Sequence, residues 1–309
     1  MKTLLIIDAH AMIHRAFHAL PELTSKDGTP TNAIYGYFLM LLNAIHTLQP
    51  SHIIVTFDTP APTFRKKLFS EYRANRPPTK EALKIQIPII RTMTEHAGLT
   101  AVSQEGYEAD DLIGSVVHTF KNGFDKIQIL SGDKDLFQLV ERKVEVVMPK
   151  RGISSFIVYT PDAVVKKMFV KPDQIADLKA IAGDSSDNYS GINGIGPKTA
   201  SKLFEQFPHV EDAYKHIEKV VPEKLKKALE EYESQVALCK KLATIVQTIS
   251  VDINLIDARF IAFDEALKND LITYNLDSLL HKLYEPQKKK KKEKKEKKPA
   301  QTEDQMGLF

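Results

Sequence analysis

The sequence contains no long hydrophobic run and only one cysteine among its 309 residues. Its longest apolar stretches, such as Thr3–Ile7 and Ile53–Phe57, are far shorter than the roughly 20 residues that a membrane helix requires. No signal-peptide pattern opens the chain. Because Cys239 has no second cysteine to pair with, an internal disulfide is excluded. We therefore expect a protein of the reducing cytoplasm that is not bound to a membrane.

Excess charge of either sign is also small, and its distribution is uneven. The net charge of +3 includes the segment Lys288–Lys298, which has nine Lys and two Glu and so carries +7. The rest of the chain is therefore weakly acidic, at −4. A weakly acidic body is a poor general binder of DNA, so acidic and basic side chains should be concentrated at separate places.

Short apolar runs alternate with segments of helical periodicity in the first half of the chain. The runs are Thr3–Ile7, His52–Phe57, Leu99–Val102 and Lys126–Leu130, and the helical segments include Ala33–Leu48 and Glu81–His96. This alternation predicts an α/β fold with a mostly parallel central sheet flanked by helices. From Pro172 to about Tyr284 the pattern becomes mainly helical, with short loops rich in Gly, Ser, Asn and Pro.

These patterns divide the chain into three regions. Residues 1–171 are predicted to form the α/β core, and residues 172–286 a helical region packed against it. Residues 287–309 contain the lysine tract and too few apolar side chains to offset the entropy of ordering. We expect this last region to be a disordered tail.

Acidic residues recur where an α/β fold places its ligand site, beyond the carboxyl ends of the strands. Asp8 and Asp58 end two predicted strands, and Asp133 follows a third. Nine carboxylates converging on one crevice would repel one another unless cations neutralised them. The nine are Asp8, Asp58, Glu108, Asp110, Asp111, Asp133, Asp135, Asp184 and Asp187.

A cluster of carboxylates without a Cys and His set favours hard divalent ions, Mg²⁺ or Mn²⁺, over structural zinc. Two such ions about 3.5–4 Å apart could activate water and stabilise the leaving oxygen of a phosphodiester. Any one Asp taken alone has another interpretation, as a helix cap or a solvated loop acid. For Asp111, which follows Asp110 in the chain, capping and metal binding both remain open.

Several motifs stand in the order and spacing of a known family. They are Glu108-Ala-Asp-Asp, Ser131-Gly-Asp-Lys-Asp-Leu-Phe-Gln-Leu, and Gly183-Asp-Ser-Ser-Asp-Asn followed by Gly194-Ile-Gly-Pro-Lys-Thr-Ala. This combination resembles the 5′–3′ exonuclease/flap endonuclease family, which includes the N-terminal domain of bacterial DNA polymerase I. The resemblance covers about Met1 to Tyr284 and implies a PIN-like nuclease core with a helix-hairpin-helix region.

The resemblance also implies two metal sites built from these carboxylates. The first would use Asp8, Asp58, Glu108 and Asp110, with Asp133 near both ions, and the second Asp135, Asp184 and Asp187, with Asp111 assisting. Two positions depart from the family pattern, because Ala9 stands where many members have Gly and Tyr189-Ser190 replaces a more usual Ile-Pro. Neither change removes a carboxylate.

The segment Gly191–Thr199 is typical of a helix-hairpin-helix turn, in which glycines let backbone amides approach a phosphate at a helix N-terminus. Such a turn holds the duplex backbone without reading its sequence. The alternative is an ordinary Gly-Pro turn between helices. By resemblance, the turn would also bind a monovalent cation, K⁺. The expected DNA-binding residues are Gly194, Ile195, Gly196, Lys198 and Thr199.

Basic and aromatic side chains are interleaved in the segment Pro60–Lys80, directly after Asp58. This pattern favours a channel for a single strand, and a solvated charged helix is the alternative. By resemblance, the segment forms a helical arch over the active site. Arg73 would then contact the scissile phosphate, with support from Lys67 and Arg76.

Two further features of the first half carry weaker signals. Tyr35 is a candidate for stacking on a base near the scissile bond, or else an ordinary core or surface tyrosine. His10, His14 and His18 recur at every fourth residue, but no H-E-x-x-H pattern or cysteine supports a zinc site. We therefore favour packing and polar contacts for these histidines, and keep His14 and Arg15 as candidates for contact with DNA.

The last five residues, Gln305-Met-Gly-Leu-Phe309, are similar to the peptide with which bacterial proteins dock on the sliding clamp, commonly Gln-Leu-x-Leu-Phe. Met306 replaces the usual Leu with another flexible apolar side chain. At the end of a disordered tether, such a peptide would raise the local concentration of the enzyme at DNA. The lysine tract would add salt-sensitive attraction to phosphates, or act only as a spacer. The expected clamp-binding residues are Gln305, Met306, Leu308 and Phe309.

The sequence thus predicts a monomeric, nucleoid-associated bacterial enzyme that acts on DNA with a 5′ flap, nick, gap or RNA primer. It would hydrolyse phosphodiesters with two metal ions, as a 5′–3′ exonuclease and flap endonuclease of replication and repair. Because no polymerase region follows, a free-standing enzyme is expected. The alternatives are a non-catalytic protein that binds branched DNA, which the intact carboxylates argue against, and an RNase H-like nuclease that removes primers.

Overall fold

The apolar runs of the first half form the central sheet in the computed structural model, which describes residues 1–150 and 155–284. The strands are β1 (Thr3–Asp8), β2 (His52–Thr56), β3 (Thr100–Val102), β4 (Lys126–Leu130), β5 (Val144–Pro149) and β6 (Phe156–Tyr159). They lie in the order β3-β2-β1-β4-β5-β6, and neighbouring strands from β3 to β5 are parallel. Only the edge strand β6 is antiparallel within this sheet. The expectation of a mostly parallel central sheet is therefore confirmed.

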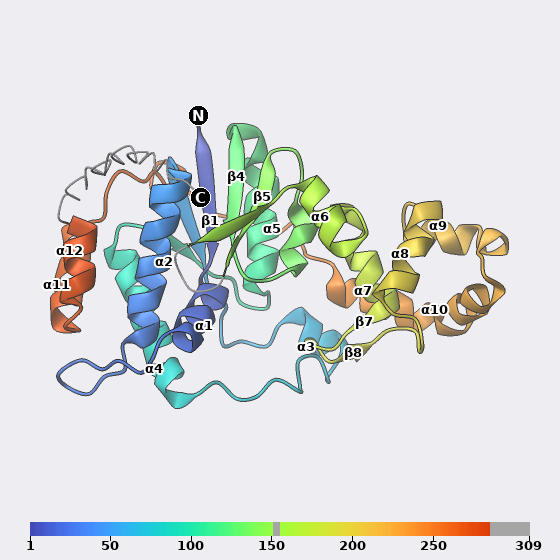
Figure 1. Ribbon diagram of the computed structural model, residues 1–309, viewed down its shortest axis with the longest axis horizontal. Coiled ribbons are helices and arrows are strands. Elements are labelled where there is room, and N and C mark those ends of the chain that lie inside the picture. The colour runs from blue at the N-terminus through green and yellow to red at the C-terminus, as the bar shows by residue number, and fades with distance from the viewer. Residues whose placement is uncertain (151–154, 285–309) are drawn as a thin grey trace, which may run out of the picture.

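Both faces of the sheet are covered, because alternate residues of each strand point to opposite sides. Leu5 and Ile7 of β1 are buried with residues of α1 (Ala9–Ala19), α2 (Asn32–Leu48) and α4 (Glu81–His96). Leu4 and Ile6 are buried in a second cluster, which includes residues of α5 (Ala109–Phe120). Figure 1 shows α2 to the left of β1 and α5 to its right. Every residue of β1 is buried, as expected for a central strand.

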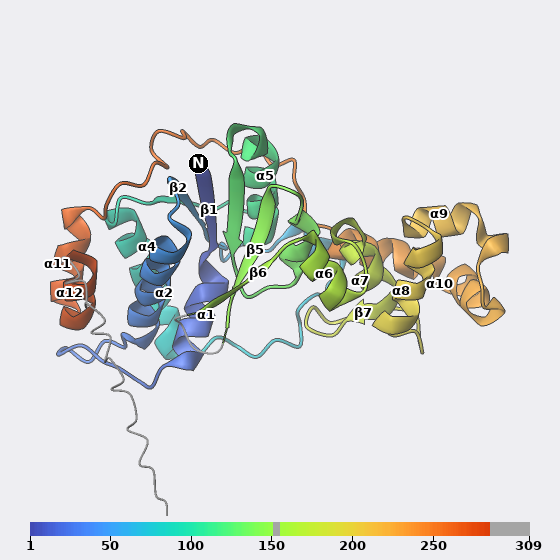
Figure 2. The ribbon, with the colours of Figure 1, turned by 45° about the horizontal axis from the view of Figure 1, so that its top comes forward.

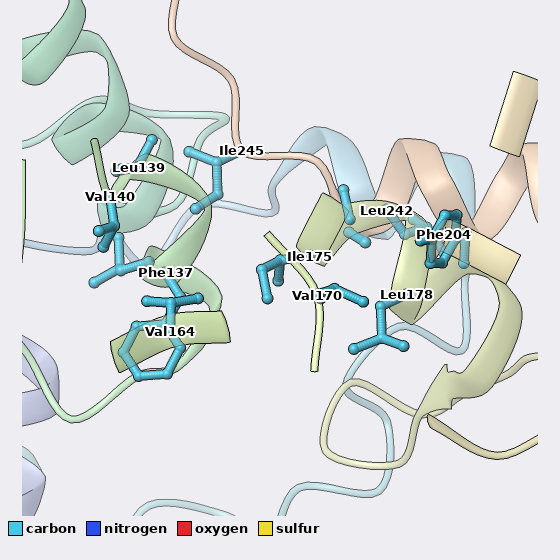
Figure 3. Packing of buried hydrophobic residues seen from close by; sticks show 14 of the residues in the cluster. Phe137, Leu139, Val140, Val164, Val170, Ile175, Leu178, Phe204, Leu242 and Ile245 are labelled. Carbon is cyan, nitrogen blue, oxygen red and sulfur yellow. The ribbon is translucent and has the colours of Figure 1, made fainter. Parts of the chain in front are cut away.

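A helical region extends from one side of the sheet, toward the right in Figures 1 and 2. Its helices are α6 (Pro161–Met168), α7 (Ile175–Ala182), α8 (Pro197–Gln206), α9 (Val210–Lys215) and α10 (Glu223–Ala243). Between α7 and α8 the short strands β7 (Gly183–Asp184) and β8 (Tyr189–Ser190) form an antiparallel pair. Figure 3 shows the packing that joins this region to the core, in which Phe137, Ile175 and Leu242 belong to one hydrophobic cluster.

The last two helices leave the helical region and return to the sheet. The chain after α10 runs back along β2, where Ile53 donates to the carbonyl of Ala258 and Phe260 to that of Ser51. The helices α11 (Glu265–Thr273) and α12 (Asp277–Tyr284) then pack against α4 and α2. The region predicted for residues 172–286 is therefore not one helical body, because the leucines of α11 and α12 are buried on the opposite face of the sheet.

The remaining described elements are short. They are α3 (Phe64–Leu68) and the 3₁₀ helices η1 (Lys121–Gly123), η2 (Asp135–Leu139), η3 (Pro172–Gln174) and η4 (Ile217–Lys219). In the part of the chain that the structure describes, no helix is both long and apolar enough to cross a membrane. The predicted tail, residues 287–309 with the peptide Gln305–Phe309, lies outside the described residues.

Candidate active site

The predicted acidic residues gather at the carboxyl ends of the parallel strands. The strand order reverses between β1 and β4, and a ligand site is expected at such a reversal. Asp8 ends β1 and Asp133 follows β4 at this point. A cavity of about 400 Å³ is lined there by Asp8, Asp58, Glu108, Asp110 and Asp133. We call these five residues, together with Asp135, Asp184 and Asp187, the carboxylate cluster.

Asp8 is fixed by backbone and side-chain donors. One of its oxygens caps α1 by accepting from the Ala11 amide at 3.0 Å, and the other accepts from the Ser131 hydroxyl at 2.6 Å. Its carboxyl is only 5% exposed. Burial raises the pKa of Asp8 to about 7, although these hydrogen bonds oppose the shift. The charged form of Asp8 therefore lacks a compensating cation.

Asp110 and Asp133 have the same imbalance as Asp8 in the first half of the cluster, the five residues around this cavity. Burial, followed by the charge of Asp133, raises the pKa of Asp110 well above its ordinary value. Among the described residues, no Lys or Arg nitrogen lies within 4 Å of the carboxylate oxygens of Asp8, Asp110 or Asp133. Asp58 is held by the amide of Ala109, which donates at 2.8 Å. Glu108 of this half is paired with Arg73 at 2.7 Å, so the shortage of positive charge is at Asp8, Asp110 and Asp133.

The second half of the cluster is instead neutralised by side chains of the protein. Carboxylate oxygens of Asp135, Asp184 and Asp187 lie within 4.8 Å of one another. The ammonium of Lys179 forms short ion pairs with both Asp135 and Asp184. Burial raises the pKa of Asp135 to about 6 against the opposing charge of Lys179, whereas the pKa of Asp184 is held below its usual value despite burial.

Arg73, predicted to contact the scissile phosphate, and Arg76, predicted to support it, are bound to carboxylates of the cluster. Arg73 donates to Glu108 at 2.7 Å and to Asp187 at 2.8 Å, and Arg76 reaches the same Asp187 oxygen at 2.8 Å. The backbone of Arg73 is left-handed, with φ of 56°, and its amide donates to the carbonyl of Asp187. This conformation aims the guanidinium into the site. Lys67 is exposed on α3 and lines neither the cavity around Asp8 nor an adjoining cavity lined by Asp133, Asp135 and Asp184.

The predicted arch differs from a continuous basic channel. The structure gives it one short helix, α3, followed by turns, rather than an extended helical arch. Arg65 and Tyr72 are 2% and 4% exposed, so neither can line a channel. The Tyr72 hydroxyl instead donates to Asp187 at 3.0 Å. The basic and aromatic pattern therefore mixes core residues with residues that face the site.

Asp111 stands apart from the cluster, and the structure corrects its prediction as a metal ligand. Its side chain is fully buried, and Arg65 donates to its two oxygens at 2.6 and 2.7 Å. The amides of Val246 and Glu108 donate to the same oxygens at 2.9 and 3.1 Å. These four donors leave no oxygen directed toward the cavity. Of the two interpretations open from the sequence, the structure favours capping, because Asp111 is the third residue of α5 and completes a capping box with Glu108.

Tyr35 is likewise placed away from the cluster. Its hydroxyl accepts from the ammonium of Lys282 in α12 at 2.9 Å, and the same ammonium lies 5.4 Å from the centre of its ring. The hydroxyl of Ser278 is 3.4 Å from the Tyr35 hydroxyl. These contacts join α2 to α12 and support the alternative, a tyrosine that joins two helices, while stacking on DNA stays a prediction.

The helix-hairpin-helix turn has the exposed backbone that the sequence suggested. Gly194 has φ of 76° and Gly196 caps α8, whose first residue is Pro197. Ile195 is buried beneath the turn, whereas Gly194, Gly196, Lys198 and Thr199 are exposed. Gly191 is required for close approach, because a Cβ there would lie 2.2 Å from the carbonyl of Ile181.

Sequence reasoning missed Lys179 and the role of Ser131. Lys179 is the single cation of α7, a helix in which six of eight residues are buried. A lone lysine in a helix of this kind indicates an acidic partner, since a buried ammonium must be paired. Ser131 is the first residue of the motif Ser131-Gly-Asp-Lys-Asp, but no sequence pattern predicts that its hydroxyl donates to Asp8.

The donor set fits divalent metal ions on chemical grounds. Its oxygens come from carboxylates alone, which suits hard ions that prefer oxygen ligands. The raised pKa values of Asp8 and Asp110 arise from burial and neighbouring negative charge, and a bound cation would relieve both costs. The cluster therefore has two places for positive charge. One is at Asp8 and Asp110, which have no protein cation among the described residues, and the other is at Asp135 and Asp184, which are paired with Lys179.

Comparison with known proteins confirms the resemblance drawn from the motifs. Residues 3–169 match the family model described as 5′-3′ exonuclease, N-terminal resolvase-like domain, and residues 170–266 match 5′-3′ exonuclease, C-terminal SAM fold. The 5′-3′ exonuclease of Aquifex aeolicus is 37% identical over 284 residues, covering 92% of this chain and 96% of that protein. DNA polymerase I of Bacillus subtilis is 37% identical over 289 residues, but the chain spans only 32% of its length.

Solved structures share the fold. The T5 5′-exonuclease, determined with bound zinc ions, superposes with a TM-score of 0.66 at 21% identity, covering 91% of this chain and 99% of that one. The catalytic core of Rad2 in complex with a DNA substrate gives a TM-score of 0.57 at 13% identity, with 92% of each chain covered. The parallel sheet and the helical extension are thus those of a known fold. Together with the matches along the sequence, they establish that this chain belongs to the 5′-3′ exonuclease family.

Proposed function

We propose that this chain is a structure-specific 5′ nuclease, which removes 5′ flaps and 5′ strands by hydrolysing phosphodiesters. The observation that carries the proposal is the uneven charge of the carboxylate cluster. Asp8 and Asp110 are buried without a described Lys or Arg partner, and Asp135 and Asp184 share Lys179. The name of the Aquifex relative and the DNA complex of Rad2 support the choice of substrate.

Two divalent ions, with Mg²⁺ as the first candidate and Mn²⁺ as a substitute, would be held by the two halves of the cluster. Asp8, Asp58, Glu108, Asp110 and Asp133 would hold one, and Asp135, Asp184 and Asp187 the other. When bound, such ions supply Lewis acidity that activates water and stabilises the leaving oxygen. Addition of water breaks the bond between phosphorus and the 3′ oxygen, and the products are a 3′-hydroxyl and a 5′-phosphate.

The protein's own cations would position the phosphate. Arg73 and Arg76 are held at the cluster by Glu108 and Asp187, with their guanidinium groups beside the expected reaction centre. A planar guanidinium can bind a phosphate through two hydrogen bonds, so these residues can transfer from carboxylate to substrate without a large movement. Lys67, exposed on α3, would add charge farther along the strand.

The turn at Gly194–Thr199 would hold the duplex part of the substrate. Its exposed glycines and the N-terminus of α8 offer backbone amides to a phosphate, with the side chain of Lys198 beside them. Contacts of this kind recognise backbone and shape rather than base sequence. A K⁺ ion bound by carbonyl groups of the turn would strengthen the same grip.

The direct experiment is cleavage of a 5′-labelled flap substrate with Mg²⁺, with EDTA, and with an RNA-primed duplex in parallel. We expect metal-dependent release of 5′ fragments, which Asp133→Asn should reduce by at least about a hundredfold while DNA binding is kept. Asp162→Asn, at an exposed acid of α6 outside the cluster, is the matched control and should cleave normally. Full activity of the Asp133 variant would reject the two-metal assignment.

The same assay separates the alternatives. Tight binding of flaps without cleavage would support a non-catalytic protein for branched DNA. Preference for the RNA-primed duplex over all DNA flaps would support an RNase H-like role. The non-catalytic alternative accounts less well for a cluster in which every predicted carboxylate except Asp111 lines one of two adjoining cavities or contacts an arginine beside them.

We also propose that the enzyme acts as a monomer at the bacterial chromosome in the cytoplasm, and that Gln305–Phe309 docks on the sliding clamp. This peptide belongs to the residues outside the described part of the chain. Deleting residues 305–309 should leave cleavage of free oligonucleotides unchanged and remove association with the clamp in a pull-down from purified components. Unchanged clamp binding by the deleted protein would reject this proposal.

A further inference from the structure

Phe169 is an aromatic residue left exposed beside the carboxylate cluster. Its side chain is 61% exposed, among the most exposed large apolar side chains of the described chain. It lines a cavity of about 980 Å³ whose walls also include Asp133, Asp135 and Asp184. The cavity shares Asp133 and His14 with the smaller cavity around Asp8, so the two form a continuous depression. An exposed phenyl ring thus borders the place proposed for the scissile phosphate.

The backbone at Phe169 is in a conformation that rarely carries such a side chain. Phe169 follows the last residue of α6 and has φ of 64° and ψ of 12°, in the left-handed region. Helices commonly end in this conformation, but the residue there is usually glycine, because a Cβ is disfavoured. A bulky residue at such a position is an outlier, and outliers of this kind concentrate at functional sites.

The neighbours of Phe169 hold it rigidly rather than leaving it loose. Val170, the next residue, is 3% exposed, and Val164 in α6 is fully buried. Figure 3 shows both valines within the hydrophobic cluster. The amide of Phe169 donates to the carbonyl of Val165 at 2.8 Å, which closes the helix. The ring therefore projects from a fixed support, because the residues on either side are anchored in the core.

The helix α1 contributes His14 and His18 to the lining of the same cavity. The cavity thus combines carboxylates, imidazole rings and a phenyl ring. Phosphates of a bound strand would approach metal ions at the carboxylates, and the bases attached to them would extend toward the aromatic walls. Every base has a π-face, so stacking on an aromatic ring holds a strand without selecting its sequence.

We propose that Phe169 is a stacking platform for a nucleobase of the DNA strand that reacts at the carboxylate cluster. This inference rests on the proposed nuclease function and adds a binding residue to it. Phe169 would act on the position of the strand and leave the chemical step to the cluster. Its contribution should therefore appear in KM and in DNA affinity rather than in kcat.

Three substitutions separate stacking from backbone effects. Phe169→Leu keeps an apolar side chain but removes the aromatic face, Phe169→Trp keeps a stacking ring, and Phe169→Gly suits the left-handed backbone. We expect Phe169→Leu to raise KM and the Kd for flap DNA by about tenfold with kcat nearly unchanged, and Phe169→Trp to restore both. Phe169→Gly should weaken DNA binding equally while raising Tm, which a purely structural role would not produce.

Abasic substrates identify the stacked base. Single abasic sites are placed in turn on both sides of the cleavage position, and Kd is measured by fluorescence anisotropy with Ca²⁺ replacing Mg²⁺. When the abasic site replaces the base that stacks on Phe169, DNA binding by the wild type should weaken. Binding by Phe169→Leu should not change there, because this variant has already lost the stacking contact. Equal losses for both proteins at every position, or a Leu variant that binds as wild type, would overturn the inference. If the wild-type protein shows no metal-dependent cleavage of flap DNA, the proposed nuclease function, on which this inference rests, would be rejected instead.

Discussion

Arg65 and Asp111 form a buried bidentate ion pair, with hydrogen bonds of 2.6 and 2.7 Å. The same guanidinium donates to the carbonyls of Leu242 at 2.8 Å and Thr244 at 2.9 Å. One side chain therefore fastens α3, the start of α5 and the end of α10, which are far apart in the sequence. This pair explains why Asp111, although it adjoins Asp110, belongs to the framework of the site rather than to its metal ligands.

Replacing Asp111 with Ala should lower the free energy of unfolding by about 3–5 kcal/mol, because it leaves a buried guanidinium without its carboxylate. Urea unfolding of the metal-free protein measures the loss. The double variant Asp111→Leu with Arg65→Met, which removes both charges, should recover most of it. A loss below about 1 kcal/mol in the single variant would show that the pair is dispensable and would reopen a metal role for Asp111.

Replacing Asp8 with Asn should have the opposite effect in the metal-free protein. The pKa of Asp8 is about 7 in the folded protein and 3.8 in the reference state, so between these values the folded state binds more protons than the unfolded state. The stability of the wild type should therefore fall as pH rises from about 4 to about 7. Asn keeps the acceptor for the Ala11 amide but carries no charge.

In EDTA at pH 8, Asp8→Asn should be more stable than the wild type by roughly 2–4 kcal/mol, with a flatter dependence on pH. The measurement is chemical denaturation at several pH values. Adding Mg²⁺ should stabilise the wild type more than the variant, since binding to the folded state raises its stability. Parallel pH profiles for the two proteins would contradict the raised pKa.

Tyr189 and Tyr72 form a matched pair of buried tyrosines near the cluster. The Tyr189 hydroxyl is buried without a hydrogen-bond partner among the described residues, whereas that of Tyr72 donates to Asp187 at 3.0 Å. Tyr189→Phe should therefore leave stability unchanged or raise it by about 1 kcal/mol, and Tyr72→Phe should lower it by about 1 to 2 kcal/mol. Thermal melts of both variants test this, and equal losses would show that Tyr189 has a partner.

Gly191 tests the close packing of the helix-hairpin-helix turn. A Cβ at this position would meet the carbonyl of Ile181 at 2.2 Å and the amide of Gly183 at 2.3 Å. Both neighbours are backbone atoms, so Gly191→Ala should cost at least about 2 kcal/mol of stability and weaken binding to duplex DNA. Gly123→Ala is the control, because nothing lies within 4 Å of a Cβ there. Similar melting temperatures for the two variants would contradict the tight turn.

The sequence predicted the features that depend on local pattern. The apolar runs ending in Asp8 and Asp58 indicated parallel strands, and parallel strands bring their carboxyl ends to one edge whatever the details of packing. The pairing of the cluster's carboxylates with Arg73 and Lys179 could not be predicted in this way. Arg73 and Asp187 are 114 residues apart, and Lys179 and Asp135 are 44 residues apart. Such pairs depend on how the helical region packs against the sheet.

Errors of interpretation came from residues whose type suits two environments. Arg65 lies in the basic segment Pro60–Lys80 that was expected to form a channel, but the structure buries it and uses it to join α3 to α5 and α10. The return of α11 and α12 to the sheet was also hidden, because a helical pattern identifies the apolar face of a helix but not its partner. Phe169 gave no signal at all, since an exposed ring in a left-handed turn is visible only from the backbone.

In the proposed two-metal function, the ammonium of Lys179 between Asp135 and Asp184 would make metal loading at these two residues an exchange of ions. A divalent ion entering there would displace a monovalent one that remains attached to the chain, so the local charge would rise by one unit instead of two. The metal-free protein would then be electrically close to the loaded one around Asp135 and Asp184. This half of the site could lose its metal and regain it without strong repulsion between the two carboxylates, whereas the described residues give Asp8 and Asp110 no such built-in cation.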